Sequence, residues 1–460
     1  MSRGPVPGPA AAILIVALAL RIAEVQRTDS TYRPINDAGS YLTLASEIAH
    51  TGDYSLSHTP GSGAGGTRGP SAYFAPGYPY FLALVDLIDG HSVRRGAAVD
   101  PARVAEAVLG TLTVALIGLV AFELFGLTAG LIALALAAVY PVAIGLAGTL
   151  VAENLLTPLV LAAVYAGLRA GRAARARSAY AWVAGAGVLT GLATLTHENA
   201  ILIGLALLVA VWQVGPRRLV APGLLIATAA LTILPWTIRN AEVMHRFIPV
   251  SDETGITLVG TYNAASAANP GVPYKWRLFY GIPGERALIR AASHLTEPQI
   301  SGKLQHQALR YISRHPLSLV SVAYDNTRRM FETEGTFAWH ASAAAISLPL
   351  GVARDGVIGF WIVCLLALAG AFSRPVRAAP KWVWAVPLLL ALSVVLVNVE
   401  TPRFRAPIDP FLLLLAAAGL STAAAAVNAR LRDRAPVRRK AGNAVTTPPG
   451  ELVEMRECLA

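Results

Sequence analysis

The sequence predicts an all-α polytopic membrane protein. We expect a bundle of about ten transmembrane helices, interfacial helices in the first outer loop and a mostly helical outer domain. Hydrophobic residues make up 55% of the 460 residues and charged residues only 14%, whereas soluble chains contain about 25% charged residues. Repeated apolar runs of membrane-spanning length account for the missing charge.

Ten apolar runs are long enough to be transmembrane helices. They lie near residues 9–24, 103–123, 127–146, 149–168, 180–196, 199–214, 218–236, 345–372, 382–398 and 405–427. The first run is not followed by a small-residue cleavage site, which favours a retained anchor over a signal peptide. The apolar segment 76–88 is short and interrupted, so we expect it to be re-entrant or to lie in the interface.

Basic residues gather in short clusters between these runs, and this pattern predicts the topology. The clusters contain Arg169, Arg172, Arg175 and Arg177; Arg217 and Arg218; Arg374, Arg377 and Lys381; and Arg430, Arg432, Arg434, Arg438, Arg439 and Lys440. With ten spans, every cluster falls on the side of the N-terminus, which the positive-inside rule makes cytoplasmic. The net charge of +11 therefore indicates a multi-pass protein of the cytoplasmic membrane and no nucleic-acid partner.

This topology predicts four regions. Residues 1–236 form an N-terminal transmembrane module whose first outer loop is 25–102, and residues 237–344 form an extracytoplasmic domain. Residues 345–427 supply the C-terminal transmembrane helices, and 428–460 form a cytoplasmic basic tail whose composition predicts disorder. The run Gly61–Gly66 is expected to be a flexible loop, because it lacks the preceding strand and the Gly-Lys-Ser/Thr ending of a phosphate-binding loop.

The first outer loop carries a carboxylate, Asp37, at the start of an amphipathic helix. The apolar face of this helix consists of Tyr41, Leu44, Ala45 and Ile48. Gly52 stands where such a helix would end. Asp37 is interpreted either as the residue that caps the helix or as a catalytic residue.

Other ionisable residues lie near the outer ends of the predicted spans. They are Glu153, His197, Glu198, Arg239, Glu400, Arg403 and Arg405. Taken singly, Glu153 is either a helix contact or a functional carboxylate, His197 and Glu198 fit an ordinary turn, and the arginines fit interfacial anchors. Taken together, cations and carboxylates on one face favour a site for an anionic ligand. Neither the histidines nor the two cysteines have metal-ligand spacing.

Several short motifs occur in a recognisable order. They are Asn36-Asp37-Ala38-Gly39-Ser40-Tyr41, Ala75-Pro76-Gly77-Tyr78-Pro79-Tyr80-Phe81, Glu153, Pro235-Trp236-Thr237-Ile238-Arg239-Asn240, Phe247-Ile248-Pro249-Val250-Ser251 with Gly255 and Gly260, and Arg403-Phe404-Arg405-Ala406-Pro407. By these motifs and their order, the chain resembles the polytopic GT-C glycosyltransferases, and the resemblance covers about residues 10 to 427. The branch with the protein O-mannosyltransferases and the lipid A aminoarabinose transferase is the most similar.

Two positions depart from the pattern of that family. Many members have two adjacent acidic residues in the first loop, whereas Asn36 precedes Asp37 here. This departure argues against the strict protein O-mannosyltransferase subgroup. His197 stands where an arginine is common, which puts a role for this position in holding the donor phosphate in doubt.

The resemblance implies a GT-C fold and a hexosyl- or pentosyltransferase that uses a polyprenyl-phosphate sugar at the outer face, with inversion. Asp37 would be the catalytic base and Glu153 would orient the acceptor or support Asp37. The donor phosphate would be bound by Arg239, Arg403 and Arg405. Candidates for substrate binding are Tyr41, Tyr78, His197 and Glu198.

The expected partners are membrane lipids, the lipid-linked sugar donor and an acceptor that is a lipid, a glycan or a protein. The residue spacing does not demand a metal or another cofactor, and Asp37 is compatible with a divalent metal. The main alternative function is a transporter or flippase of a lipid-linked sugar. Transporters place ionisable groups near the membrane midplane, whereas here these groups are predicted at the outer ends of the spans. Two further alternatives are a transferase with a diphosphate-lipid donor and a structural membrane scaffold.

Overall fold

The computed structural model describes residues 7–56, 69–90, 100–215, 217–277 and 294–434. Residues 1–421 form one compact unit and residues 422–460 another, and the packing described below is that of the first unit. The regular structure of the described residues is helical, with an isolated antiparallel bridge between Ser55 and Pro70. The predicted all-α class is confirmed. The run Gly61–Gly66 and the tail after residue 434 lie outside the described residues.

Seven helices in the described part of the chain are long and apolar enough to cross a membrane. They are α1 (Pro7–Thr28), α4 (Pro101–Phe125), α7 (Glu153–Arg172), α8 (Ala176–Thr196), α10 (Val220–Met244), α17 (Leu350–Ala371) and α20 (Asp409–Arg434). The other three predicted spans contain shorter apolar helices, α5 (Leu127–Ala138), α9 (Ile203–Val211) and α19 (Lys381–Val395). The protein is therefore a multi-pass membrane protein, and three of its apolar helices are shorter than we predicted.

Local sequence explains two of these short helices. Pro141 begins the separate helix α6 (Pro141–Leu146), and Tyr140 before it has an extended backbone. Proline has no N–H to donate and biases the preceding residue away from the helical region, so α5 cannot continue through it. Helix α9 follows a 3₁₀ turn, η3 (Glu198–Leu202), which takes up the first part of its predicted span.

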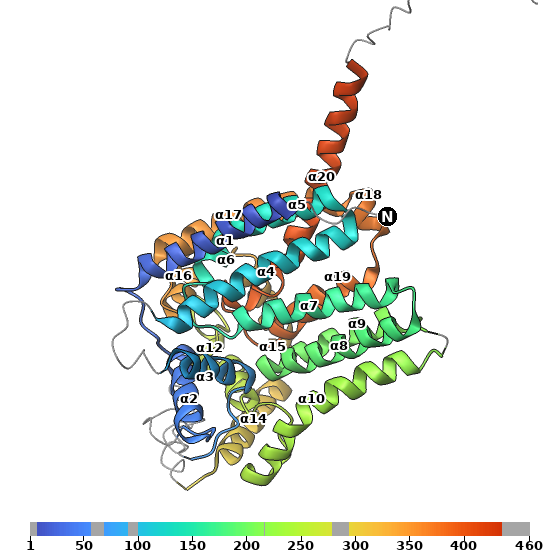
Figure 1. The fold of residues 1–460 in the computed structure, drawn as a ribbon. Coiled ribbons are helices and arrows are strands. Elements are labelled where there is room, and N and C mark those ends of the chain that lie inside the picture. Colours follow the sequence, from blue (N-terminus) through green and yellow to red (C-terminus); the bar gives the residue numbers. More distant parts are fainter. Residues whose placement is uncertain (1–6, 57–68, 91–99, 216, 278–293, 435–460) are drawn as a thin grey trace, which may run out of the picture. The chain divides into compact units, whose positions relative to one another are not determined.

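Most of the helices that are not spans lie where α1 ends and α7 begins (Figure 1). We call this part of the bundle the Asp37 end. Two of them belong to the first loop, α2 (Asp37–Thr51) and α3 (Gly77–Asp89). The later segment supplies α11 (Thr254–Thr261), α12 (Ala264–Ala267), α14 (Glu297–Arg314), α15 (Ser318–Met330) and α16 (Thr336–Ala345). The short helix α18 (Arg374–Ala378) joins α17 to α19, and the 3₁₀ turn η4 (Arg403–Arg405) joins α19 to α20.

The amphipathic helix predicted after Asp37 is present as α2. Its buried face contains Tyr41, Leu44 and Ala45, and Gly52 ends the helix with φ 81°. A positive φ costs glycine little because it has no Cβ, so the helix stops at this residue. The predicted interfacial segment 76–88 forms α3, which packs on α2.

Helix α14 is tied to the first loop by a buried carboxyl group. Glu297 accepts hydrogen bonds from Ser71 Oγ at 2.8 Å and from the Ala72 N–H at 2.7 Å. Burial raises the pKa of Glu297 to about 7, although both hydrogen bonds act to lower it. This contact holds the first loop against the segment that follows α10.

Helices α8 and α10 pack closely at a glycine. A Cβ atom at Gly187 would overlap Thr228 Oγ1 and come within 2.5 Å of the Leu225 carbonyl oxygen. Two residues earlier, a Cβ atom at Gly185 would meet nothing within 4 Å. The absence of a side chain at Gly187 therefore sets how closely the two helices approach.

Replacing Gly187 by alanine should push α8 away from α10 and cost about 1–3 kcal/mol of stability, as overpacking does. Gly185→Ala should be neutral or stabilising by up to about 1 kcal/mol, because alanine favours helices more than glycine does. The thermal unfolding midpoint of each purified variant in detergent measures both effects. Equal midpoints for the two variants would contradict this packing.

Candidate active site

Arg403 lies at the centre of a group of carboxylates at the Asp37 end. Its Nη1 is 2.7 Å from Asp37 Oδ2, and its Nε is 3.6 Å from Glu400 Oε2 and 3.9 Å from Glu153 Oε1. Loss of water lowers the pKa of Arg403, but the three carboxylates more than offset this and hold its pKa well above the usual value. The guanidinium is therefore a fixed positive charge among these carboxylates.

Asp37 is the first residue of α2 and does not cap it. The N-cap position is occupied by Asn36, whose side-chain N–H donates to the Ala345 carbonyl at 2.9 Å. The Asp37 carboxylate turns to Arg403 instead, and 32% of its side chain remains exposed. Asp37 is thus both held by a cation and accessible from outside the bundle.

Glu153 is the first residue of α7, whereas the predicted span begins at residue 149. Its side chain is buried. Carboxylates are favoured at a helix N-terminus by the helix dipole, and Arg403 supplies an opposite charge. The structure therefore brings Asp37, Glu153 and Arg403 together from three distant parts of the chain.

Arg405, two residues after Arg403, belongs to a separate buried cluster. Its Nε lies 3.1 Å from Asp409 Oδ1 and its Nη1 lies 3.2 Å from Glu332 Oε1. The guanidinium also covers the Phe360 ring at 3.4 Å. With 1% of the residue exposed and two carboxylates against it, Arg405 links α17, α20 and the turn after α15, so we leave it out of the phosphate site.

Arg239 holds the first loop. Its Nη1 donates to the Ser71 carbonyl at 2.7 Å and its Nη2 donates to the Tyr54 carbonyl at 2.9 Å. The guanidinium lies 4.8 Å from the centre of the Trp236 ring. These contacts support the shape of the loop, and among the described residues they do not join Arg239 to the Arg403 group.

Tyr41 and Tyr78 lie in the aromatic core beneath α2 and α3. The Tyr41 ring is 4.8 Å from that of Phe74 and 4.9 Å from that of Tyr78. Tyr78 is fully buried and its hydroxyl donates to Glu106 Oε1 at 2.7 Å. Both tyrosines therefore support the helix that carries Asp37, and neither presents an open surface to a substrate.

His197 and Glu198 lie between α8 and α9, next to this site. The His197 ring packs edge-on against Phe404, 6.2 Å between centres, and Arg403 covers the same Phe404 ring at 4.5 Å. Glu198 Oε2 accepts a hydrogen bond from Ser251 Oγ at 2.5 Å. The connection between α8 and α9 thus contacts both Phe404 and the segment before α11.

The sequence did not indicate Glu253, which precedes α11 and faces the same charges. Loss of water raises the pKa of Glu253 to about 8, with further contributions from Asp37 and Glu198. Its sequence neighbours, Ser251 and Asp252, offered only a short polar stretch as a signal. The raised pKa of Glu253 favours the protonated form of a carboxyl group that lies in the field of Asp37.

Asp37 does not fit a metal site in this arrangement. Its carboxylate is paired with Arg403, and the described residues contain no group of three or more His, Cys, Asp or Glu side chains able to hold a metal ion.

The pKa of Glu253 predicts a pH dependence of stability. The pKa is raised from 4.5 to about 8 on folding, so the folded state binds the proton more tightly, and its stability falls as the pH rises between these values. Glu253→Gln keeps the group neutral and should flatten this fall in the unfolding midpoint between pH 5 and 8.5. Glu242→Gln, on the exposed end of α10, is the control, and an unchanged slope in Glu253→Gln would contradict the assignment.

One protein family matches part of this chain, and solved structures are similar to most of it. Residues 74–238 match the family described as dolichyl-phosphate-mannose-protein mannosyltransferase. No curated protein matches this chain.

Solved structures are similar to the chain over almost its whole length. The archaeal oligosaccharyltransferase AglB from Archaeoglobus fulgidus, in complex with an inhibitory peptide and a dolichol-phosphate, has a TM-score of 0.53 and 14% identity over 94% of this chain and 52% of that chain. The Archaeoglobus fulgidus oligosaccharyltransferase in complex with Zn and sulfate has a TM-score of 0.52 and 15% identity over 93% and 50%. ArnT from Cupriavidus metallidurans bound to undecaprenyl phosphate has a TM-score of 0.43 and 18% identity over 93% and 80%.

The chain spans about half the length of the archaeal oligosaccharyltransferase. The segment matched by the family model contains Glu153, His197 and Glu198 and ends one residue before Arg239. The fold of this chain is therefore similar to that of the archaeal oligosaccharyltransferase, and the family match covers residues 74–238 of the chain.

Proposed function

We propose that this protein transfers a hexosyl or pentosyl group from a polyprenyl-phosphate donor to an acceptor hydroxyl, inverting the anomeric carbon. The reaction takes place on the outer face of the cytoplasmic membrane, and both termini are cytoplasmic. One observation carries the proposal. A partly exposed carboxylate, Asp37, is held 2.7 Å from a buried arginine, Arg403, at one end of a membrane bundle.

Asp37 acts as the general base. The acceptor oxygen attacks the anomeric carbon and its proton passes to the Asp37 carboxylate as the new C–O bond forms. The exposed part of Asp37 lets the acceptor approach and lets the proton leave to water afterwards. Arg403 orients the carboxylate before the attack.

The bond that breaks joins the anomeric carbon to the donor phosphate, and its electron pair stays on the phosphate oxygen. Phosphate monoesters have a second pKa of about 6, so this leaving group needs no general acid. It does need positive charge as it departs, and Arg403 is the cation placed to supply it. Glu153, buried beside Arg403, fixes the position of the guanidinium.

The comparisons support a lipid-phosphate donor. The family matched over residues 74–238 is described by dolichyl-phosphate-mannose as donor, and the AglB structure contains a dolichol-phosphate together with a peptide. Residues 1–236 carry the base in this proposal, 237–344 cover it from outside, and 345–427 contribute the arginine turn. The acceptor class is a lipid, a glycan or a protein.

Transfer is favoured over transport of the lipid-linked sugar. Transporters place ionisable groups near the membrane midplane between broken helices. Here Asp37, Glu153 and Arg403 lie at the first residue of α2, the first residue of α7 and the turn before α20. A transporter would move the donor with its sugar still attached, so release of the sugar from the lipid separates the two functions.

Asp37→Asn should fold normally and lose transfer by about 10²–10⁴-fold, the usual contribution of a general base. Purified protein is incubated with a panel of labelled polyprenyl-phosphate sugars, and the label that leaves the lipid is measured. Glu242→Gln serves as the control for the loss of a surface carboxylate. Turnover of Asp37→Asn close to that of the wild type would remove Asp37 from the mechanism.

Arg403→Ala should raise the donor KM about tenfold or more, since a hydrogen bond to a charged group contributes about 1.5–3 kcal/mol. The acceptor KM should change little. The matched control is Arg218→Ala, an exposed arginine before α10, and Arg403→Lys tests whether charge alone restores binding. Equal donor KM values for Arg403→Ala and Arg218→Ala would place the phosphate elsewhere.

A further inference from the structure

A second cation, Lys275, faces the Arg403 group from the segment after α12. Its Nζ lies 3.7 Å from Glu400 Oε1, and Arg403 Nε lies 3.6 Å from the other oxygen of the same carboxylate, Glu400 Oε2. Glu400 is therefore an anion placed between two cations from distant parts of the chain. All three side chains are largely buried, with 12–14% of each exposed.

The contacts of Glu400 with these two cations are electrostatic, because both distances exceed that of a hydrogen bond. The Arg403 Nε has no hydrogen-bond partner among the described residues and is buried. An unsatisfied buried donor is costly. An acceptor that comes closer than Glu400 would remove this cost.

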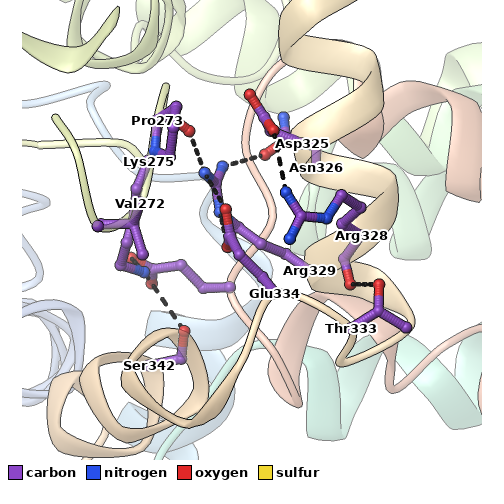
Figure 2. Close-up of polar contacts among 12 residues, drawn as sticks. Val272, Pro273, Lys275, Asp325, Asn326, Arg328, Arg329, Thr333, Glu334 and Ser342 are labelled. Atoms are coloured by element: carbon purple, nitrogen blue, oxygen red, sulfur yellow. Dashed lines mark hydrogen bonds and ion pairs between the residues drawn. The ribbon is translucent and has the colours of Figure 1, made fainter. Parts of the chain in front are cut away.

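Lys275 is held firmly in place by its surroundings. Its Nζ donates to Ser342 Oγ at 3.3 Å, and Tyr274 N–H donates to the Ser266 carbonyl at 2.8 Å. Figure 2 shows Arg329 beside Lys275, hydrogen-bonded to the Pro273 carbonyl, Asn326 and Glu334. The turn that carries Lys275 is thereby attached to α15.

The charge of Lys275 is only partly compensated. Loss of water lowers the pKa of Lys275, Glu400 acts to raise it, and the nearby charge of Arg329 lowers it again. Arg329 itself is paired with Glu334 at 2.6 Å. A stronger anion than one shared carboxylate would stabilise the ammonium group.

We propose that Lys275 and Arg403 bind the phosphate group of the lipid donor, and that the Glu400 carboxylate lies between these two cations until the phosphate displaces it. The inference rests on the proposed function, since it assigns the ligand of the same site. The phosphate of the intact donor is a diester with one negative charge, and on transfer it becomes a monoester that carries more charge than one carboxylate and has three acceptor oxygens. It can bridge the two cations at hydrogen-bond distance while Glu400 turns away.

The two substitutions have opposite expected effects on binding. Lys275→Gln should weaken the binding of undecaprenyl phosphate about tenfold or more, the loss of one charge-assisted hydrogen bond. Glu400→Gln should tighten the binding severalfold, because the competing anion is removed. A purely structural role for Glu400 would make its substitution weaken binding.

The experiment measures equilibrium binding of labelled undecaprenyl phosphate to the full-length protein in nanodiscs, without any sugar. Lys303→Gln on the exposed face of α14 and Glu242→Gln on the exposed end of α10 are the matched controls. Lys275→Arg tests rescue by a second cation. Size-exclusion profiles identify any variant that fails to fold. If Lys275→Gln fails to fold, the binding of undecaprenyl phosphate to Glu400→Gln tests the proposal.

Undecaprenol and inorganic phosphate separate the lipid from the free anion. Undecaprenol should bind equally to all variants, and inorganic phosphate alone should compete weakly. Tight binding of inorganic phosphate without binding of the lipid phosphate would overturn the assignment, as would unchanged binding in both Lys275→Gln and Glu400→Gln. If the variants change the binding of the lipid phosphate as expected but the wild type transfers no sugar, the phosphate site stands and only the proposed transferase function is refuted.

Discussion

The ion pair between Arg403 and Asp37 is the contact on which the site depends. It joins residues 366 positions apart in the sequence. Asp37, Glu153 and Glu400 all face the same guanidinium, and without it these carboxylates would repel one another in a partly buried place. Removing one partner of a buried ion pair leaves an uncompensated charge, so Arg403 holds these carboxylates together.

The surrounding fold keeps this pair at the surface of a membrane bundle. Arg239 holds two carbonyl groups of the first loop, and Glu297 on α14 holds the same loop from the other side through Ser71 and Ala72. The aromatic packing of Tyr41 with Phe74 and Tyr78 fixes α2 from below. Residues proposed as ligands from their chemistry therefore include several that support the position of Asp37.

Arg403 and Arg405 belong to the same short motif but make different contacts. Both belong to the 3₁₀ turn η4, in which three residues complete a turn, so residues two apart point in different directions. Arg403 faces Asp37, whereas Arg405 faces Asp409 and Glu332. The motif Arg403-Phe404-Arg405 predicted two equivalent phosphate ligands, and only the geometry distinguishes the contact of Arg403 with the partly exposed Asp37 from the fully buried contacts of Arg405.

The sequence by itself determined the all-α membrane class, the approximate position of each apolar helix, the amphipathic helix after Asp37 and the set of ionisable residues near helix ends. These features depend on hydrophobic length, on helical periodicity and on local stop signals such as Gly52, all of which act over a few residues. Only the tertiary structure decided which charges meet. The pairing of Asp37 with Arg403, the nearness of Glu253 and the placement of Lys275 beside Glu400 depend on contacts between segments far apart in the chain, and electrostatic interactions carry no signature in local sequence.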